Sequence, residues 1–371
     1  MKALSLFSNV GVAETFLESC GVNVVVANEL LEQRARFYRH LYPQVKMIEG
    51  DITDQQVYRE VIAAARGERI DFLIATPPCQ GMSESGYRNP YDERNSLIKY
   101  AIDAILDLRP SYVLLENVPQ QLTTPIQYLG KEMLIPEYVE KRIGKYYTIN
   151  EDKIINAMYY AVPQMRERAI FLCVGKSINK MWNFPKPQNE IITLEKAFEG
   201  IPDLWPLIKE PEFQTKLPQN TRNVLSFSRW HRPMTHVWRN IECMLYTPTG
   251  HSAFENKKYY PKRADGKRIR GYETTYRRMY WDKPGHTIST FNLRIGSQSN
   301  VHPGRPWKRD SQGEMMYTNP RALSIYELLI VSSLPVDWNI PEWASDNLIR
   351  TVIGEGIPPL LVKCLVQHMP K

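Results

Sequence analysis

Apolar residues in the first 175 positions follow two alternating patterns. Short continuous apolar runs are typical of buried strands, and longer segments with apolar residues three or four positions apart are typical of helices. The runs predict strands at residues 3–7, 22–27, 45–48, 70–75, 112–115 and 169–174. The periodic segments predict helices at residues 12–19, 30–41, 54–66 and 97–108. This alternation predicts an α/β fold with a doubly wound, mostly parallel sheet that helices cover on both faces.

The pattern changes after Lys176. Prolines recur between residues 185 and 218, and helical periodicity returns only at residues 324–334 and 358–369. The last of these segments is apolar enough to face a core, so we expect it to pack against the first domain. We therefore predict a first domain at residues 1–175 plus 345–371 and a second, smaller domain at residues 176–344.

The net charge of +7 is unevenly distributed along the chain. Residues 222–310 contain 18 Lys and Arg against 6 Asp and Glu, a net charge of +12, so the remainder carries −5. A basic surface is common in globular proteins, but here aromatic residues such as Trp230, Tyr260 and Trp281 lie among the charges. This mixture favours a polyanion as the partner of the second domain.

Several classes of protein are disfavoured by what the sequence lacks. No apolar run approaches the roughly 20 residues of a membrane span, so we expect no contact with a membrane. Residues 1–5 lead directly into a strand without the pattern of a signal peptide. Five cysteines are scattered without Cys-x-x-Cys or zinc-ligand spacing, which favours a reducing cytoplasm and no metal.

The segment Pro77-Pro78-Cys79-Gln80 follows the predicted strand at residues 70–75. Proline restricts its own backbone and that of its predecessor, so the next side chain is presented in a fixed direction. Ligands of open α/β sheets bind outside the carboxyl ends of strands, which makes Cys79 a candidate nucleophile. An arbitrary cysteine is more often a small buried thiol. The prolines and the polar loop that follows favour the nucleophile, and we expect that loop to close over the site.

A carboxyl group and an arginine segment are predicted to lie near Cys79. Glu116 ends the strand expected next to it, where a partly buried carboxyl has a raised pKa and can donate a proton. The alternative is a structural acid paired with an arginine. Gln164, Arg166 and Arg168 alternate on a strand-like segment and therefore face one way. Their alternative is the exposed face of an edge strand.

Three successive strand ends supply a candidate groove for an adenosine-like ligand. The first strand leads into a turn at Phe7 to Gly11, the second is followed by Glu29, and the third by Asp51. Carboxylates at these places can accept hydrogen bonds from ribose hydroxyls and an adenine amino group. Each acid alone is more often a cap or a surface residue. The single glycine of the turn is not a dinucleotide fingerprint, which disfavours a dehydrogenase.

In this order, the motifs resemble the C5-cytosine DNA methyltransferase family of the prokaryotic restriction–modification type. The resemblance covers the whole chain except its variable middle. The residues Pro78-Cys79-Gln80 resemble the family's nucleophile motif, and Glu116-Asn117-Val118 its catalytic-acid motif. Residues 6–11 resemble the family's methyl-donor loop, and Glu29 and Asp51 resemble its adenosine-binding acids. Further matches are Gln164-x-Arg166-x-Arg168, Arg321-Ala322-Leu323-Ser324 with Glu327, and residues 353–358.

The resemblance implies a mechanism and a set of roles. It implies a Rossmann-like catalytic first domain that uses S-adenosylmethionine and a target-recognition second domain. The Cys79 thiolate would add to C6 of a flipped-out cytosine in duplex DNA while Glu116 donates to N3, with Arg168 on O2 and Arg166 bracing the site. Expected donor contacts are Phe7, Gly11, Glu29, Asp51, Ile52, Pro78, Leu97 and Gly356. Expected DNA contacts are Gln80, Ser83, Arg229, Arg232, Lys262, Arg263, Arg268 and Arg270.

Four positions depart from the family pattern. Ser5 replaces an aspartate, Asn9 and Val12 replace glycines in the donor loop, and Glu355 replaces an asparagine in the last motif. Two other functions remain open: a transfer RNA cytosine methyltransferase on the same scaffold, and a DNA-binding regulator without catalysis. We expect a monomer in a prokaryotic cytoplasm, associated with the nucleoid. A cognate restriction endonuclease would act on the same site without direct contact.

Overall fold

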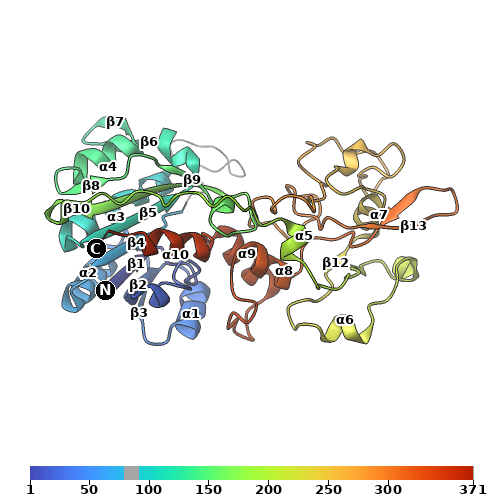
Figure 1. The fold of residues 1–371 in the computed structure, drawn as a ribbon, viewed down its shortest axis with the longest axis horizontal. Helices are drawn as coiled ribbons and strands as arrows, with labels where there is room; N and C mark the ends of the chain where they lie inside the picture. Colours follow the sequence, from blue (N-terminus) through green and yellow to red (C-terminus); the bar gives the residue numbers. More distant parts are fainter. Residues whose placement is uncertain (79–91, 371) are drawn as a thin grey trace.

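Within the described residues 1–78 and 92–370 of this computed structural model, eight strands form one sheet (Figure 1). Their order is β3-β2-β1-β4-β5-β10-β8, and β9 also pairs with β10. The strands are β1 (Lys2–Leu6), β2 (Asn23–Glu29), β3 (Lys46–Glu49), β4 (Phe72–Ala75), β5 (Tyr112–Asn117), β8 (Tyr147–Ile149), β9 (Ile154–Asn156) and β10 (Glu167–Gly175). The pairings from β3 to β5 are parallel, and those of β10 are antiparallel. The predicted mostly parallel α/β sheet is confirmed.

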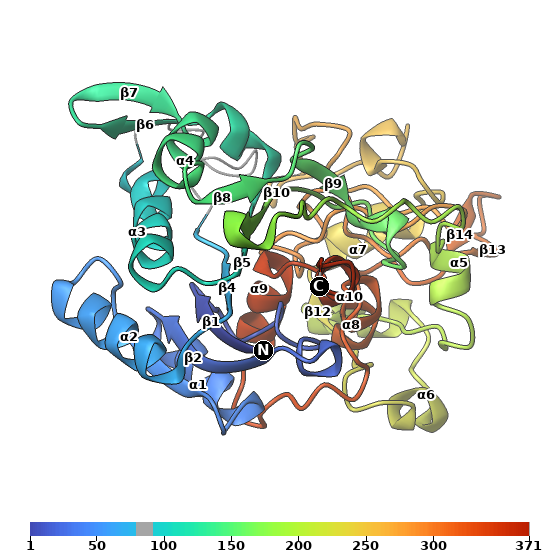
Figure 2. The same cartoon turned by 60° about the vertical axis from the view of Figure 1, so that its left-hand side comes forward.

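Helices cover both faces of the sheet. The N-terminal helices are α1 (Glu32–Leu41), α2 (Gln55–Glu68), α3 (Ile98–Leu108) and α4 (Ile135–Ile143). Buried side chains of α2, α3 and α4 form one core with the sheet, whereas α10 (Pro359–Gln367) and Trp182 form a second core on the other face. Figure 2 shows the sheet between α2 and α3 on one side and α10 on the other. The last helix therefore packs against the sheet, as its apolar pattern predicts.

The predicted helix at residues 12–19 is wrong. The segment forms turns closed by bonds between residues three apart, from Thr15 N to Val12 O and from Leu17 N to Glu14 O, and ends in η1 (Glu18–Cys20). Gly21 then adopts a left-handed conformation with φ +76°. Helical stability in a protein comes mostly from tertiary packing, and the buried contacts of this segment, such as that of Glu14 with Ser5, favour turns instead. Asp54 caps α2, because its carboxylate accepts hydrogen bonds from the backbone N–H groups of Gln56 and Val57.

Short elements connect β5 to β10 and follow β10. The hairpin strands β6 (Pro125–Tyr128) and β7 (Lys131–Leu134) precede α4. The later helices and strands are α5 (Leu194–Ala197), β11 (Leu207–Ile208), α6 (Arg222–Ser226), β12 (Thr235–His236), α7 (Trp238–Leu245), β13 (Pro306–Arg309), β14 (Met315–Tyr317), α8 (Ile325–Val331) and α9 (Asp346–Glu355). The 3-10 helices besides η1 are η2 (Glu93–Leu97), η3 (Pro119–Thr123), η4 (Ala157–Tyr159), η5 (Lys176–Ile178), η6 (Pro211–Lys216) and η7 (Ala253–Glu255).

A third core connects the sheet region with the later part of the chain. It contains Val10 and Val12 of the turn after β1, Phe37 of α1, and buried apolar residues of α8 and α9. In Figure 1, α8 and α9 lie between the sheet and the elements α6, α7, β12 and β13. The turn after β1 therefore packs against α8 and α9 in addition to following directly from a strand of the sheet. Among residues 1–78 and 92–370, no helix is long and apolar enough to cross a membrane.

Candidate active site

The carboxyl ends of β1, β2 and β3 meet at one edge of the sheet. Glu29 accepts a hydrogen bond from the backbone N–H of Asn9 at 2.9 Å and another from Leu31 at 2.9 Å. The side chain of Asn28 donates to the carbonyls of Ile48 and Gly50, which joins the end of β2 to the turn after β3. The structure thus brings together the turn, Glu29 and the segment containing Asp51, as parallel strand ends predict.

The turn after β1 has a tightly constrained backbone. Phe7, Asn9 and Gly11 have φ values of +56°, +51° and +83°. At Gly11, an added Cβ would lie 2.2 Å from the Tyr42 ring, and the Tyr42 hydroxyl donates to the Gly11 carbonyl at 2.6 Å. Gly11 is therefore required by both its conformation and its surroundings. Asn9 tolerates the left-handed region better than most side chains, which permits it where the family has glycine.

A buried carboxyl group lies beneath this turn. Glu14 accepts a hydrogen bond from the Ser5 hydroxyl at 2.5 Å, and burial raises the pKa of Glu14 to about 7. Two of the residues that depart from the family pattern, Ser5 and Val12, thus have contacts in the folded chain that involve their side chains. Ser5 bonds Glu14, and Val12 packs against Gly356, where an added Cβ would lie 2.6 Å from Val12 Cγ1.

The remaining expected donor residues differ in their exposure to solvent. Asp51 is exposed and accepts from the Thr53 N–H, while Ile52 is buried behind it. Leu97 is half-buried at the junction of η2 and α3. An ionised carboxylate has about four acceptor positions, so both Glu29 and Asp51 can accept further hydrogen bonds from a ligand. These residues fit a ligand with ribose hydroxyls and an adenine amino group.

Cys79, Gln80 and Ser83, with most of the loop expected to close, lie outside the described residues. The chain leading to Cys79 is held at two points. The Asn117 side chain at the end of β5 donates to the Pro77 carbonyl at 3.1 Å, and the Thr76 hydroxyl donates to the Phe7 carbonyl at 3.0 Å. Pro78, the last described residue before Cys79, therefore lies between the turn after β1 and the end of β5.

Glu116 and Arg168 form an ion pair at this edge. In the antiparallel pairing of β5 with β10, Glu116 lies opposite Ile170, and Arg168 Nε lies 2.7 Å from Glu116 Oε1. Both side chains are less than a tenth exposed. Burial raises the pKa of Glu116, while the charges of Arg168 and Arg166 oppose that shift. The pair contains both the carboxyl expected as an acid and the arginine expected beside it.

Gln164 and Arg166 share a face but contact backbone carbonyls of other segments. Arg166 donates to the Ile288 carbonyl at 2.9 Å and to the Gly354 carbonyl at 2.8 Å. Gln164 donates to the Val331 carbonyl and accepts from the Ile288 N–H. Both side chains are buried, which excludes the exposed edge-strand face. Arg166 therefore braces the end of α9 against residue 288.

The expected DNA-binding side chains of the later region face solvent to different extents. Arg229, Arg232, Arg263, Arg268 and Arg270 are exposed, and Lys262 is half-buried. Lys262 and Arg268 pair in a short hairpin whose turn contains Arg263, and both cations lie over the Tyr260 ring. The guanidinium of Arg229 lies over Trp230 at 4.7 Å from the ring centre. The basic side chains of this hairpin therefore pack against the ring of Tyr260.

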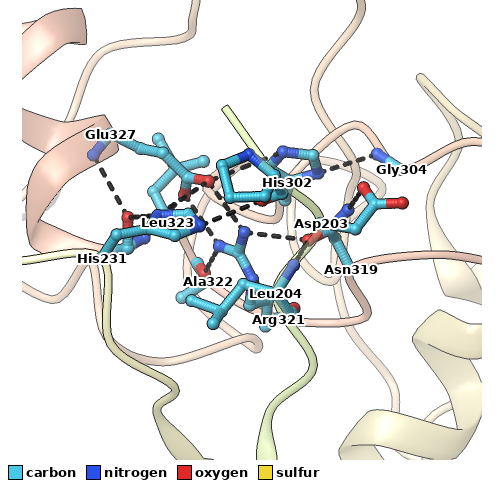
Figure 3. Close-up of polar contacts among 12 residues, drawn as sticks. Asp203, Leu204, His231, His302, Gly304, Asn319, Arg321, Ala322, Leu323 and Glu327 are labelled. Atoms are coloured by element: carbon cyan, nitrogen blue, oxygen red, sulfur yellow. Dashed lines mark hydrogen bonds and ion pairs between the residues drawn. The ribbon is translucent and has the colours of Figure 1, made fainter. Parts of the chain in front are cut away.

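The motif that starts at Arg321 forms a buried polar network (Figure 3). Arg321 donates to both carboxylate oxygens of Glu327 at 2.7 Å, and both side chains are fully buried. His231 contacts the Ser324 hydroxyl, and His302 lies 3.7 Å from Glu327. Although burial opposes it, Arg321 and the two histidines hold the pKa of Glu327 well below its usual range. The roles of His231 and His302 were not predicted, because they lie far from the motif in sequence.

Comparison with known proteins finds relatives along the entire chain. The sequence profile described as C-5 cytosine-specific DNA methylase matches residues 1–371. The chain belongs to this family. It is 40% identical over 371 residues to the Type II methyltransferase M1.HgaI of Avibacterium volantium, covering 99% of this chain and 97% of that protein. It is 26% identical to M.Eco47II of Escherichia coli, covering 90% and 71%.

Solved structures show the same fold. A prophage-encoded E. coli protein described as a DNA modification methyltransferase has a TM-score of 0.67 at 19% identity, covering 99% of this chain and 98% of that one. DNMT2 of Spodoptera frugiperda has a TM-score of 0.58 at 12% identity, covering 98% and 99%. Membership in the C-5 cytosine-specific DNA methylase family makes this chain a DNA cytosine-5 methyltransferase, and the family uses S-adenosylmethionine. The predicted family and activity are confirmed.

Proposed function

We propose that this methylase modifies one cytosine within a short specific sequence of duplex DNA and so protects host DNA in a restriction–modification system. The 40% identity to a Type II methyltransferase along nearly the whole of both chains supports this setting over transfer RNA modification or a regulator without catalysis. A cognate restriction endonuclease would recognise the same sequence without touching this protein. The enzyme would act as a monomer in the cytoplasm, associated with the nucleoid.

The chemistry is proposed to centre on Cys79, Glu116 and Arg168. The Cys79 thiolate forms a bond to C6 of the cytosine while the Glu116 carboxyl donates its proton to N3, so that C5 gains enamine character. The observation that carries this assignment is the Arg168 Nε to Glu116 Oε1 contact of 2.7 Å, at the edge where Asn117 holds Pro77. Arg168 would hydrogen-bond the cytosine O2, and Arg166 would hold the surrounding segments. C5 would then form a bond to the methyl group of the donor, whose sulfur keeps the electron pair of the broken bond. A base would remove the C5 proton, N3 would return its proton to Glu116 and the Cys79 thiolate would leave, which restores the aromatic ring as 5-methylcytosine.

The methyl donor is proposed to bind at the carboxyl ends of β1 to β3. S-adenosylmethionine supplies an electrophilic methyl group on a sulfonium. Glu29 would accept from the ribose hydroxyls and Asp51 from the adenine amino group. Phe7, Gly11, Ile52, Pro78, Leu97 and Gly356 would complete the donor groove. The contacts of Glu29 with the turn and of Gly356 with Val12 support this placement.

Recognition of the DNA sequence is proposed for a domain at residues 176–344, with catalysis at residues 1–175 plus 345–371. The target atom is inaccessible within a stacked duplex, so the cytosine must be flipped out. Gln80 and Ser83 would contact DNA next to Cys79. The side chains proposed to contact phosphates or guanine edges are Arg229, Arg232, Lys262, Arg263, Arg268 and Arg270.

Bisulfite sequencing of DNA from a host that expresses the protein tests this function. Cytosines that resist bisulfite conversion only within one short recurring sequence would support specific C5 methylation, and they would identify the modified position. DNA from a host that expresses the C79A variant provides the matched control and should show no protection. Protection scattered without a common sequence, or equal protection by C79A, would contradict the proposal.

A further inference from the structure

Two of the departures from the family pattern contact each other. Asn9 replaces a glycine in the donor loop and Glu355 replaces an asparagine in the last motif. Although 346 positions apart in sequence, Asn9 Nδ2 donates to Glu355 Oε2 at 3.3 Å. The backbone N–H of Asn9 donates to Glu29 at the same time. Asn9 therefore bridges two carboxylates, one expected at the ribose and one at the end of α9.

Arg34 of α1 completes the cluster. Its Nη2 lies 2.9 Å from Glu355 Oε1 and 2.8 Å from Glu355 Oε2, with both side chains about a fifth exposed. The Glu355 backbone carbonyl is also within reach of Arg166 at 3.3 Å. The cluster thus joins α1, α9 and the turn after β1, and its polar groups are largely removed from solvent. An ion pair in such a position is screened less than one on the surface.

The orientation of the Asn9 amide follows from this arrangement. A carboxylate is only an acceptor, so Glu355 requires the NH2 group of Asn9 on its side. Among the described residues, Asn9 Oδ1 is buried without a hydrogen-bond partner. An unsatisfied buried acceptor is costly unless another contact of the same side chain compensates for it. The Asn9–Glu355 contact therefore adds a restraint to a turn that a glycine at position 9 would leave freer.

We propose that Asn9, Glu355 and Arg34 form a latch that positions the turn after β1 for the methyl donor. This inference rests on the proposed donor site, and it assigns a positioning role to each of the three residues. Without Glu355, the left-handed Asn9 loses the contact that compensates for its buried oxygen. Without Asn9, the Glu355 carboxylate keeps Arg34 but loses its second side-chain donor. The two departures are therefore expected to depend on each other.

A double-mutant cycle with N9G, E355N and N9G/E355N tests this dependence, because both changes restore the family pattern. Binding of S-adenosylhomocysteine, measured by titration calorimetry without DNA, reports on the donor site apart from turnover. Each single variant should weaken binding about three- to tenfold, the size expected for one partly buried polar contact. The double variant should bind within about twofold of the weaker single variant, because the same contact is lost once.

Two further variants separate positioning from general destabilisation. R34A should weaken binding in the same range, while R39A removes an exposed arginine of the same helix, paired with Glu49, and should leave binding unchanged. Steady-state kinetics of N9G should show a raised KM for S-adenosylmethionine with kcat preserved within about twofold at saturating donor. Thermal unfolding without ligand provides the stability control.

The outcomes distinguish this inference from the proposed function. If the unmodified protein binds no S-adenosylhomocysteine, the proposed donor site and the latch both fail. If it binds and the single effects multiply in the double variant, the latch alone is wrong. Unchanged binding in N9G and E355N with lowered thermal stability would assign the cluster a structural role only, which also overturns the inference.

Discussion

Arg168 and Glu116 form a buried ion pair across the antiparallel pairing of β10 with β5, with 2.7 Å between Nε and Oε1. This geometry is therefore compatible with both interpretations of Glu116, as an acid catalyst and as a structural acid paired with an arginine. Burial favours the protonated carboxyl, and Arg168 favours the carboxylate. A substrate that engages Arg168 would shift this balance toward the proton that Glu116 is proposed to donate.

The R168A variant should lose both activity and stability. Removing the guanidinium leaves Glu116 buried without its counter-charge, which costs about 3–5 kcal/mol in the free energy of unfolding at pH 8. The double variant E116Q/R168A should recover much of that loss, because no unpaired charge remains. Urea unfolding measures both values. Additive losses in the double variant would show that the two side chains do not interact in solution.

The C79A variant separates chemistry from DNA binding. If Cys79 is the nucleophile, methyl transfer should fall below detection, because no covalent bond to C6 can form. Binding to a duplex that contains the recognised sequence should change by less than about threefold, since phosphate contacts supply most of the affinity. Filter-bound tritiated methyl groups and fluorescence anisotropy measure the two quantities. Residual methylation near the wild-type rate would exclude Cys79 as the nucleophile.

The pKa of Glu14 predicts a pH dependence of stability. Burial raises it to about 7 from an ordinary value of 4.5, so the folded protein holds a proton that the unfolded chain releases. The stabilisation from this proton is complete below about pH 4.5 and is lost as the pH rises through about 7. The E14Q variant, which keeps an acceptor for Ser5, should therefore be more stable than the wild type at pH 8.5 by roughly 2–3 kcal/mol.

Urea unfolding of wild type and E14Q at pH 5.5 and 8.5 checks this sign. The advantage of E14Q should shrink at pH 5.5, where the wild-type carboxyl is largely protonated in the folded state. E18Q changes a glutamate in the neighbouring η1 helix that lies outside the buried core, and it serves as the control. An advantage of E14Q that is independent of pH would point to packing instead of titration.

The sequence predicts the strands of the sheet because their signal is local. An apolar run such as residues 112–115 indicates a buried strand without information from the rest of the chain, and the polar residue that follows it indicates the edge of the sheet where a site is expected. Glu29 and Glu116 could be placed on this basis. The helix predicted at residues 12–19 failed because its periodicity is also local, whereas Ser5, Gly21 and the core beneath determine its shape.

Contacts between distant segments could not be predicted in this way. The spacing of Gln164 and Arg166 indicates a common face, but not that both bond the backbone of residue 288. Likewise, Asn9 and Glu355 were recognised as departures from a pattern, and only the folded chain brings them together. Such pairs carry no periodic signal, because each residue is compatible with many local structures.

The buried pair of Arg321 and Glu327 should be sensitive to neutralisation. In E327Q, Arg321 keeps its charge within a fully buried network, and the free energy of unfolding should fall by about 3–5 kcal/mol. The matched control is E68Q, which neutralises the exposed pair of Lys2 and Glu68 and should cost less than about 1 kcal/mol. Equal effects of the two substitutions in urea unfolding would contradict the importance of burial.

The same network should destabilise the protein in acid. Burial lowers the pKa of both His231 and His302, so below about pH 6.5 the unfolded chain takes up protons that the folded protein excludes. The lowered pKa of Glu327 adds a further loss below about pH 4.5. The histidines should thus reduce stability between pH 7 and 5, opposite in sign to the contribution of Glu14 over the same range, and H302Q should be less destabilised by acid than the wild type. A pH dependence identical in H302Q and wild type would exclude His302 as a contributor.

The hairpin around Arg263 provides a test of the DNA-binding surface. Arg263 is exposed at its turn, and the cations of Lys262 and Arg268 lie over Tyr260, so R263A should remove a charge without disturbing the core. If Arg263 contacts a phosphate, R263A should weaken binding to specific and non-specific duplexes alike and reduce the slope of log K against log salt by about 1. If it reads a base, only the specific duplex should lose affinity, by about 1–3 kcal/mol. Anisotropy titrations at several salt concentrations distinguish these cases. The control is K46A, which removes an exposed lysine of the edge strand β3. Unchanged binding of R263A to both duplexes would exclude the hairpin from the DNA interface.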